Sequence, residues 1–116
     1  MRELTKLFKA LSDETRIRIL KVLMERECCV CEVMQALNIS QSRASRNLGI
    51  LADAGFVKSR RDGLWIVYSI AEQTVNSHAA SLTEMLRSSL VNDEIISQDR
   101  ERLSHAMRVG PRAIGR

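Results

Sequence analysis

Aromatic residues and proline are scarce in this sequence. Two Phe, one Trp, one Tyr and one Pro occur among 116 residues, and aromatics make up only 3% of the chain. Such a composition favours helices that pack through Leu, Ile, Val, Ala and Met side chains. The length corresponds to one domain with one hydrophobic core.

Long apolar runs are also lacking. No stretch approaches the roughly 20 apolar residues that a transmembrane helix needs. The N-terminal segment, MRELTKLFKALSDE, carries a charge every few residues, which excludes a secretory signal peptide. These absences predict a cytoplasmic protein without a membrane partner.

Cysteine is confined to one short segment. The three cysteines, Cys28, Cys29 and Cys31, all lie within ERECCVCEVMQAL, residues 25–37. An odd number of cysteines at such close spacing does not suit a disulfide framework. The cluster therefore indicates thiol or metal chemistry in the cytosol.

Positive charge is concentrated in the middle of the chain. The net charge is +4, yet residues 1–39 hold seven Lys/Arg against six Asp/Glu, and residues 71–116 hold six against six. Residues 40–70 hold five Lys/Arg against two Asp/Glu. A local excess of this kind is typical of a surface that binds nucleic acid, although a solvated face would look the same.

Apolar residues at helical spacing recur along the chain. They predict helices over 4–11, 13–25, 29–37 and 40–55, and a helix after residue 72 with the stripe Val75, Ala79, Leu82, Leu86 and Leu90. Ser12 and Ser40 are predicted N-caps, and Gly55 is predicted to end the fourth helix. A further helix is expected over 93–107, followed by a frayed tail.

Residues 56–70, FVKSRRDGLWIVYSI, change to a strand-like pattern. They are rich in β-branched and aromatic residues, and Asp62-Gly63 is a strong signal for a two-residue hairpin turn. With that turn at the centre, Arg60 is predicted to lie opposite Trp65 and to form a cation–π pair.

The order of elements predicts a mainly helical fold with a β-hairpin, α-α-α-α-β-β-α. Residues 38–40 form a three-residue break between two short helices, which is the spacing of a helix-turn-helix. With the hairpin as a wing, this is a winged helix-turn-helix. The second helix of the motif would enter the major groove of DNA.

The predicted recognition helix turns short polar and basic side chains outward if Ala44, Leu48 and Leu51 are buried. Gly49 costs about 1 kcal/mol relative to Ala inside a helix, which suggests that another group approaches it closely. Arg can pair with guanine, Gln with adenine, and Ser with phosphates or bases, while Arg at a wing tip can reach phosphates or a narrow minor groove. We therefore expect DNA contacts from Gln41, Ser42, Arg43, Ser45, Arg46, Asn47, Arg60 and Arg61.

Several segments resemble the ArsR/SmtB repressors in order and spacing: LSDETRIRIL (11–20), CVCEVMQAL (29–37), SQSRASRNLGILADAGFV (40–57) and RRDGLWIVYSI (60–70). The resemblance implies a homodimer, paired through the first and last long helices, that binds double-stranded operator DNA with an inverted repeat and is released by an inducing ion. We divide the chain into a winged helix-turn-helix DNA-binding and dimerisation domain, 1–92, and a C-terminal helical extension with a flexible tail, 93–116.

The arsenic box of that family corresponds to RECCVCEV, residues 26–33. Cys29 and Cys31 occupy its C-x-C pair, and Met34 stands where a third thiol is often found. Cys28 replaces a residue that is usually apolar. The resemblance implies As(III) or Sb(III) as the inducer, and no enzymatic cofactor. Because the metalloid prefers three thiolates, we predict Cys28, Cys29 and Cys31 as its ligands.

The spacing of the pair has a mechanical consequence. On a regular helix Cys29 and Cys31 lie about 200° apart and cannot converge, so binding requires a helix that begins irregularly or unwinds. That helix is the first of the helix-turn-helix. Closing the site would therefore displace the recognition helices from the half-site spacing that they need.

Other metal sites of the family are incomplete here. The segment that carries a D-x-H zinc motif in relatives reads Asn76-Ser77-His78, with Ser89 and Asn92 at the later positions. We interpret His78 as a structural or surface residue, and His105 has no clear partner. The N-terminus has no cysteine, so a cadmium or lead site with N-terminal thiols is also missing.

Other functions remain open for the cysteine cluster. Oxidation to a sulfenate or a disulfide would make the repressor a redox switch. Zinc or cadmium could bind the same thiols, although no fourth ligand is evident. A thiol enzyme is disfavoured, because the two His lie far along the chain and neither a Gly-rich phosphate loop nor paired catalytic carboxylates are present.

Overall fold

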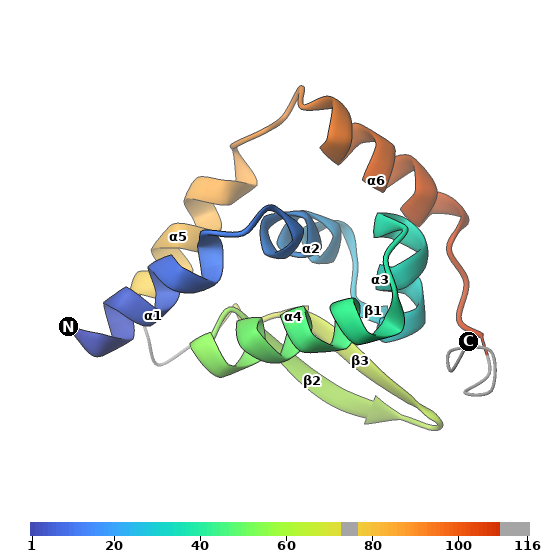
Figure 1. Cartoon of the computed structure of the whole chain (residues 1–116), viewed down its shortest axis with the longest axis horizontal. Helices are drawn as coiled ribbons and strands as arrows, with labels where there is room; N and C mark the ends of the chain where they lie inside the picture. The colour runs from blue at the N-terminus through green and yellow to red at the C-terminus, as the bar shows by residue number, and fades with distance from the viewer. Residues whose placement is uncertain (73–76, 110–116) are drawn as a thin grey trace.

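The computed structural model describes residues 1–72 and 77–109 (Figure 1). Its elements are α1 (Arg2–Leu11), α2 (Glu14–Glu25), β1 (Cys28–Cys29), α3 (Val30–Leu37), α4 (Gln41–Ala54), β2 (Val57–Asp62), β3 (Trp65–Ile70), α5 (Ser77–Arg87) and α6 (Glu94–His105). The predicted fold class is confirmed: the chain is mainly helical, with a helix-turn-helix formed by α3 and α4 and a hairpin wing formed by β2 and β3. Val75, Asn76 and the tail after Val109 lie outside the described residues.

The helices pack around α2, which lies at the centre of the molecule (Figure 1). Helices α1 and α5 lie side by side at one end, and α6 lies beside α3 at the other. The largest fully buried apolar side chains come from helices on both sides of α2, from α2 itself and from the sheet: Leu7, Ile19, Leu20, Val33, Leu48, Leu51, Phe56 and Val67. One continuous core therefore holds the helix-turn-helix against the wing.

Side-chain caps fix the ends of the helices that flank the turn. Ser40 accepts a hydrogen bond from the backbone N–H of Arg43, and Gly55 ends α4 with a φ of 96°, as predicted. The prediction that Ser12 caps α2 is wrong. Asp13 is the N-cap and accepts from the backbone N–H of Arg16, because Ser12 ends α1 and donates to the carbonyl of Lys9.

The sheet has three antiparallel strands in the order β1-β3-β2. Strand β1 was not predicted. It pairs Cys28 with Tyr68 and Cys29 with Val67, so the cysteine segment is attached directly to the wing.

The predicted hairpin register is wrong: the turn is centred one residue later than predicted, so each residue of β2 pairs with a residue of β3 two positions further along. Asp62 pairs with Trp65, which places Gly63, with a φ of +63°, at the first central position of the turn. Arg60 consequently lies opposite Val67 and not opposite Trp65. The predicted cation–π pair between Arg60 and Trp65 is replaced by one between Arg108 and Trp65.

The α5 stripe is largely used inside the chain. Ala79 and Leu86 are buried in the chain's own core, whereas Leu90 is 41% exposed and follows the helix in a turn. Helix α6 begins after that turn and packs on α2 and α3. Over residues 1–72 and 77–109, no helix is both long and apolar enough to span a membrane.

Candidate thiol site and DNA-binding surface

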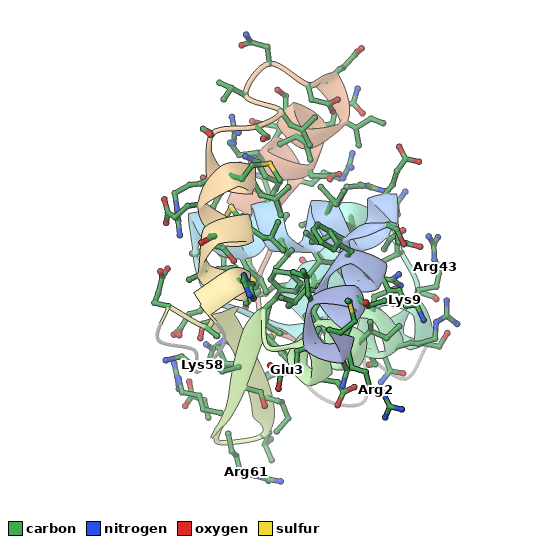
Figure 2. The ribbon with its side chains drawn as sticks, turned by 90° about the vertical axis from the view of Figure 1, so that its left-hand side faces the viewer. Arg2, Glu3, Lys9, Arg43, Lys58 and Arg61 are labelled. Atoms are coloured by element: carbon green, nitrogen blue, oxygen red, sulfur yellow. A yellow bond between two sulfur atoms is a disulfide. The ribbon has the colours of Figure 1, made fainter. Side chains whose placement is uncertain are left out.

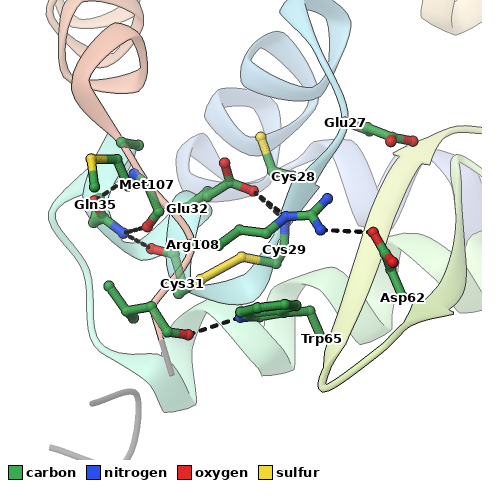
Figure 3. The surroundings of a disulfide bond; sticks show 12 residues. Glu27, Cys28, Cys29, Cys31, Glu32, Gln35, Asp62, Trp65, Met107 and Arg108 are labelled. Atoms are coloured by element: carbon green, nitrogen blue, oxygen red, sulfur yellow. Dashed lines mark hydrogen bonds and ion pairs between the residues drawn. A yellow bond between two sulfur atoms is a disulfide. The ribbon is translucent and has the colours of Figure 1, made fainter. Parts of the chain in front are cut away.

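The pair Cys29 and Cys31 lies where β1 meets α3, and a disulfide joins the two sulfurs (Figure 3). Cys29 is the N-cap of α3 in an extended conformation, with φ −77° and ψ 170°, and Cys31 is the second residue of the helix. Because the helix begins only at Val30, the 200° separation of a regular helix does not apply. The Cα atoms lie 5.5 Å apart, and the irregular start brings the thiols together.

Cys28 does not join this pair. Neighbouring residues of a strand point to opposite faces, and Figure 3 shows the Cys28 side chain directed away from Cys29 and Cys31. Its thiol donates to the carbonyl of Arg26 at 3.5 Å and is fully buried. Burial raises the pKa of the Cys28 thiol to about 12, against the opposing effect of the Arg26 charge. Among the described residues, no group of three His, Cys, Asp or Glu side chains is arranged to hold a metal ion.

Glu32 is the main charged group at the site, although the sequence did not single it out. Its buried carboxylate accepts from the backbone N–H of Cys29 at 2.9 Å and from Nη1 of Arg26 at 2.7 Å. The N–H of Glu32 in turn meets the Cys29 side chain, which completes a capping box. The S/T-x-x-E pattern is recognisable in Cys29-x-x-Glu32 once Cys is allowed in the position of Ser.

The segment after α6 covers the site from outside. Gln35 donates to the carbonyls of both Cys31, at 2.9 Å, and Met107, at 2.7 Å. The guanidinium of Arg108 lies 5.6 Å from the ring centroid of Trp65, and the indole N–H of Trp65 donates to the carbonyl of Val109 at 2.8 Å. The hydrogen bonds that this segment forms with Gln35 and Trp65 join residues 72 and 44 positions apart, which no local pattern can reveal.

Most of the predicted DNA-contacting residues on α4 are exposed. They lie on the face of the helix that is turned away from the core: Gln41, Ser42, Arg43, Ser45 and Arg46. The Arg43 guanidinium also donates to Thr15 of α2 at 2.8 Å, so its position is partly fixed. A methyl group added at Gly49 would meet nothing within 4 Å, so packing within the described chain does not require glycine there.

Asn47 is a correction to the predicted surface. It is only 3% exposed, its side-chain carbonyl accepts from Arg16 at 2.9 Å, and its amide donates to the carbonyl of Arg43 at 2.9 Å. Its amide is therefore used to fasten α4 to α2. This buried position does not favour a DNA contact by Asn47.

The two arginines of the wing have different surroundings. Arg60 forms ion pairs with Glu27 and with Asp62, whereas Arg61 is exposed near the tip of the hairpin. Figure 2 shows Arg61 at the tip of the wing and Arg2 at the start of α1, both on the lower side of the view. Arg61 is thus better placed than Arg60 to reach a phosphate.

Neither histidine is brought to the thiols. His78 is exposed on α5, and His105 is exposed at the end of α6, where its Nε2 lies 3.1 Å from the Glu101 carboxylate. The position of His78 agrees with its interpretation as a structural or surface residue, whereas Glu101 is a partner of His105 that the sequence did not reveal.

Comparison with known proteins places these features in one family. The model described as "Bacterial regulatory protein, arsR family" matches residues 13–59, which run from the cap of α2 through the thiol site and α4 into β2. The chain is 38% identical to the arsenic resistance transcriptional regulator ArsR1 of Pseudomonas putida over 98 residues, which cover 84% of this chain and 74% of that protein.

Solved structures agree with this placement. The transcriptional repressor BigR from Xylella fastidiosa superposes with a TM-score of 0.67 at 32% identity, covering 80% of this chain and 88% of that one. The homodimeric winged helix-turn-helix DNA-binding domain Mb0332 from Mycobacterium bovis gives 0.64 at 29% identity, covering 74% and 76%. These two neighbours are thus described as a transcriptional repressor and as a DNA-binding domain. The chain belongs to the ArsR family of bacterial regulatory proteins and is a winged helix-turn-helix transcriptional repressor of that family.

Proposed function

We propose that this repressor binds an inverted-repeat operator as a homodimer and is released when As(III) or Sb(III) binds Cys29 and Cys31. The observation that carries the proposal is the meeting of these two sulfurs at the junction of β1 and α3. The similarity to an arsenic resistance regulator supports the choice of a metalloid.

The donor set fits a thiophilic ion in part. In the reduced state Cys29 and Cys31 supply two soft thiolates, the ligand type that such ions select. Cys28 supplies the third sulfur only if β1 separates from β3, because it faces the other side of the strand and its thiol is buried. Two thiolates and an external donor, such as hydroxide, therefore form the proposed first complex.

DNA recognition rests on α4 and the wing. Arg46, Gln41 and the exposed serines of α4 enter the major groove, where Arg pairs best with guanine and Gln with adenine. Arg43 flanks them, and Arg61 and Arg60 of the wing approach the phosphates or the minor groove. The local excess of positive charge over residues 40–70 supports this orientation.

The dimer forms through α1 and α5. Phe8 of α1 is 55% exposed and Met85 of α5 is 50% exposed, although the two helices pack side by side. Apolar side chains left at the surface of adjacent helices are suited to an interface with a second copy. The homodimeric relative supports the formation of a dimer.

Release follows from the position of the thiols. Cys31 lies in α3, which is joined to the recognition helix through residues 38–40. Rearrangement of the pair around a metalloid moves α3 and changes the spacing of the two recognition helices in the dimer. A tenfold loss of operator affinity needs only about 1.4 kcal/mol of differential binding between the two states.

A redox trigger is the second candidate, and the disulfide between Cys29 and Cys31 favours it. Oxidation by a peroxide converts two thiols into one disulfide and two waters, with two electrons passing from sulfur to the peroxide oxygens. Disulfide and metalloid would then compete for the same two sulfurs.

The test is an operator-binding titration of the reduced protein with arsenite, zinc, cadmium and peroxide in parallel. We expect arsenite to release the operator, and Cys29→Ser and Cys31→Ser to bind the operator normally without responding. Release by peroxide alone would replace the metalloid with the redox trigger. A normal arsenite response in both serine variants would refute the site.

A further inference from the structure

The four residues that follow α6, 106–109, form a strap across the thiol site (Figure 3). Gln35 of α3 binds both backbone polar groups of one strap residue: it donates to the carbonyl of Met107 at 2.7 Å and accepts from the N–H of Met107 at 3.1 Å. Because the same amide also donates to the carbonyl of Cys31, the strap is tied to the helix that carries one of the thiols.

The other end of the strap is tied to the wing. The carbonyl of Val109 accepts from the indole N–H of Trp65 at 2.8 Å. Nη1 of Arg108 lies 2.7 Å from the Asp62 carboxylate, and its guanidinium lies over the Trp65 ring. Asp62 and Trp65 are the paired residues that close the hairpin, so the strap grips the wing at its tip.

Arg108 is the residue that reaches both sides. Its Nε lies 3.7 Å from the Glu32 carboxylate, while Nη1 is bound to Asp62. Glu32 in turn accepts from the backbone N–H of Cys29. A continuous series of polar contacts therefore runs from the N-cap thiol residue through Glu32 and Arg108 to the tip of the wing.

We propose that Arg108 is a positioning residue that couples the state of the Cys29–Cys31 pair to the wing. The proposal rests on the proposed function, since it assigns a second output to the same thiol site. A ligand that rearranges the pair moves Cys29 and the first turn of α3, and Glu32 moves with them. Arg108 then cannot maintain its contacts with Glu32, Asp62 and the Trp65 ring at the same time. The wing consequently changes its orientation.

The chemistry of arginine suits this role. The planar guanidinium offers five N–H donors in a fixed fork and stacks on an aromatic ring. A lysine at this position could pair with Asp62 but could not also present a flat face to Trp65 and a separate donor to Glu32. Coupling of this kind travels through packed and hydrogen-bonded groups that have two arrangements.

Trp65 is the only tryptophan of the chain, so its fluorescence reports the contact between strap and wing directly. The probe is phenylarsine oxide added to the reduced protein. This reagent needs only two thiols, because the phenyl carbon is the third ligand of its arsenic. Its arsenic exchanges the oxygen for two sulfurs with release of one water, and no oxidation state changes. The variants are Arg108→Gln, Arg108→Lys and the control Arg100→Gln, which removes an α6 arginine paired with Glu25 at 3.1 Å.

We expect phenylarsine oxide to shift the Trp65 emission in the wild type and in Arg100→Gln, and to shift it by less than about a third as much in Arg108→Gln. Thiol titration should give the same two reactive groups in all variants. Arg108→Lys should recover part of the shift at most. An equal shift in Arg108→Gln, or no shift in the wild type, would overturn the coupling.

Operator affinity provides the second measurement. If arsenite weakens binding by about tenfold in the wild type, the factor should fall to about twofold in Arg108→Gln and stay unchanged in Arg100→Gln. An equal arsenite factor in Arg108→Gln would overturn the coupling. Failure of arsenite to change operator affinity in the wild type would instead refute the proposed function, and the Trp65 emission would still decide the role of Arg108.

Discussion

The Glu32 carboxylate accepts a hydrogen bond of 2.9 Å from the backbone N–H of Cys29, so the N-cap of α3 is also a member of the thiol pair. The geometry of the pair and the start of the first helix of the helix-turn-helix are thus set by the same contacts. Any reagent that binds the pair acts on this helix end, and any change at Glu32 should alter the pair.

Replacement of Glu32 tests this dependence. Glu32→Ala removes the acceptor of the Cys29 N–H and the buried partner of Arg26, so we expect a loss of about 2 kcal/mol in the free energy of unfolding. Glu32→Gln keeps an oxygen acceptor and should cost about half as much. Urea denaturation of the reduced proteins measures both. Glu84→Ala, which breaks an exposed pair with Arg87, is the control and should cost less than about 0.5 kcal/mol.

A second pair of variants separates DNA contact from structural support on α4. Arg46→Ala should weaken operator binding and, if Arg46 meets a phosphate, reduce the slope of log affinity against log salt by about 1. Its thermal stability and its metalloid affinity should remain close to those of the wild type, because Arg46 is exposed. Unchanged operator binding would remove Arg46 from the interface.

Asn47→Ala should behave in the opposite way. It removes the hydrogen-bond acceptor of Arg16 Nη1 and the donor to the carbonyl of Arg43, so the free energy of unfolding should fall by about 1–2 kcal/mol. The ratio of the affinity for the operator to the affinity for random DNA, measured on the folded fraction, should equal that of the wild type. A relaxed sequence preference with unchanged stability would return Asn47 to the DNA surface.

Local patterns predicted the presence of the helices and the hairpin, because the residues that start and end these elements lie within or directly beside them in the sequence. The Ser40 cap and the Gly55 stop of α4 are examples. Strand β1 carries no such signal: its two cysteines are extended because they pair with Tyr68 and Val67, about forty residues away. The hairpin register failed because Gly63 suits either central position of a two-residue turn.

The candidate site was also predictable only in part, because some of its contacts join residues far apart in the sequence. Cys29-x-Cys31 is a local pattern, and its need for an irregular helix start follows from helical geometry. The contributions of Glu32 and Arg108 depend on contacts with Arg26 and with the tip of the wing, and the burial of Asn47 depends on a contact with α2. A helical wheel cannot distinguish an outward polar residue from one that meets a neighbouring helix.

Asp99 holds α6 on the rest of the molecule. It is 1% exposed and accepts from Arg18 of α2 and from Arg102, and the hydrogen bond to Asp99 raises the pKa of Arg18. Asp99→Ala removes the carboxylate that binds the half-buried guanidinium of Arg18, so we expect a loss of about 2 kcal/mol in the free energy of unfolding. Limited proteolysis should cut α6 first. Glu101→Ala, on the exposed side of α6, should have neither effect.

Acid should release the strap from the wing. The hydrogen bond from Arg108, with Arg60 also nearby, lowers the pKa of Asp62 below its ordinary value. A lowered carboxylate pKa means that docking is fully favoured above the ordinary value of about 3.9 and is lost as the pH falls through the lowered pKa. Trp65 emission should therefore stay constant from pH 7 to about 4 and change below that.

The acid step should depend on Asp62 itself. In Asp62→Asn the emission at pH 7 should already resemble that of the acid form, without a further step at low pH. Asp53→Asn on α4, which breaks an exposed pair with Lys6 of α1, should titrate as the wild type does. Identical acid titrations of the wild type and Asp62→Asn would show that the indole does not sense this carboxylate.

Cys28 decides how many thiols the switch needs. Its side chain faces away from the pair, and burial holds its thiol pKa at about 12, so it stays protonated near neutral pH. We expect Cys28→Ala to retain arsenite-induced release, at a cost of about 1 kcal/mol in stability from the small cavity in the core. Operator binding with and without arsenite, at a temperature where the variant is folded, measures the response. Complete loss of release in a folded Cys28→Ala would mean that β1 separates from β3 when the metalloid binds and that Cys28 becomes its third ligand.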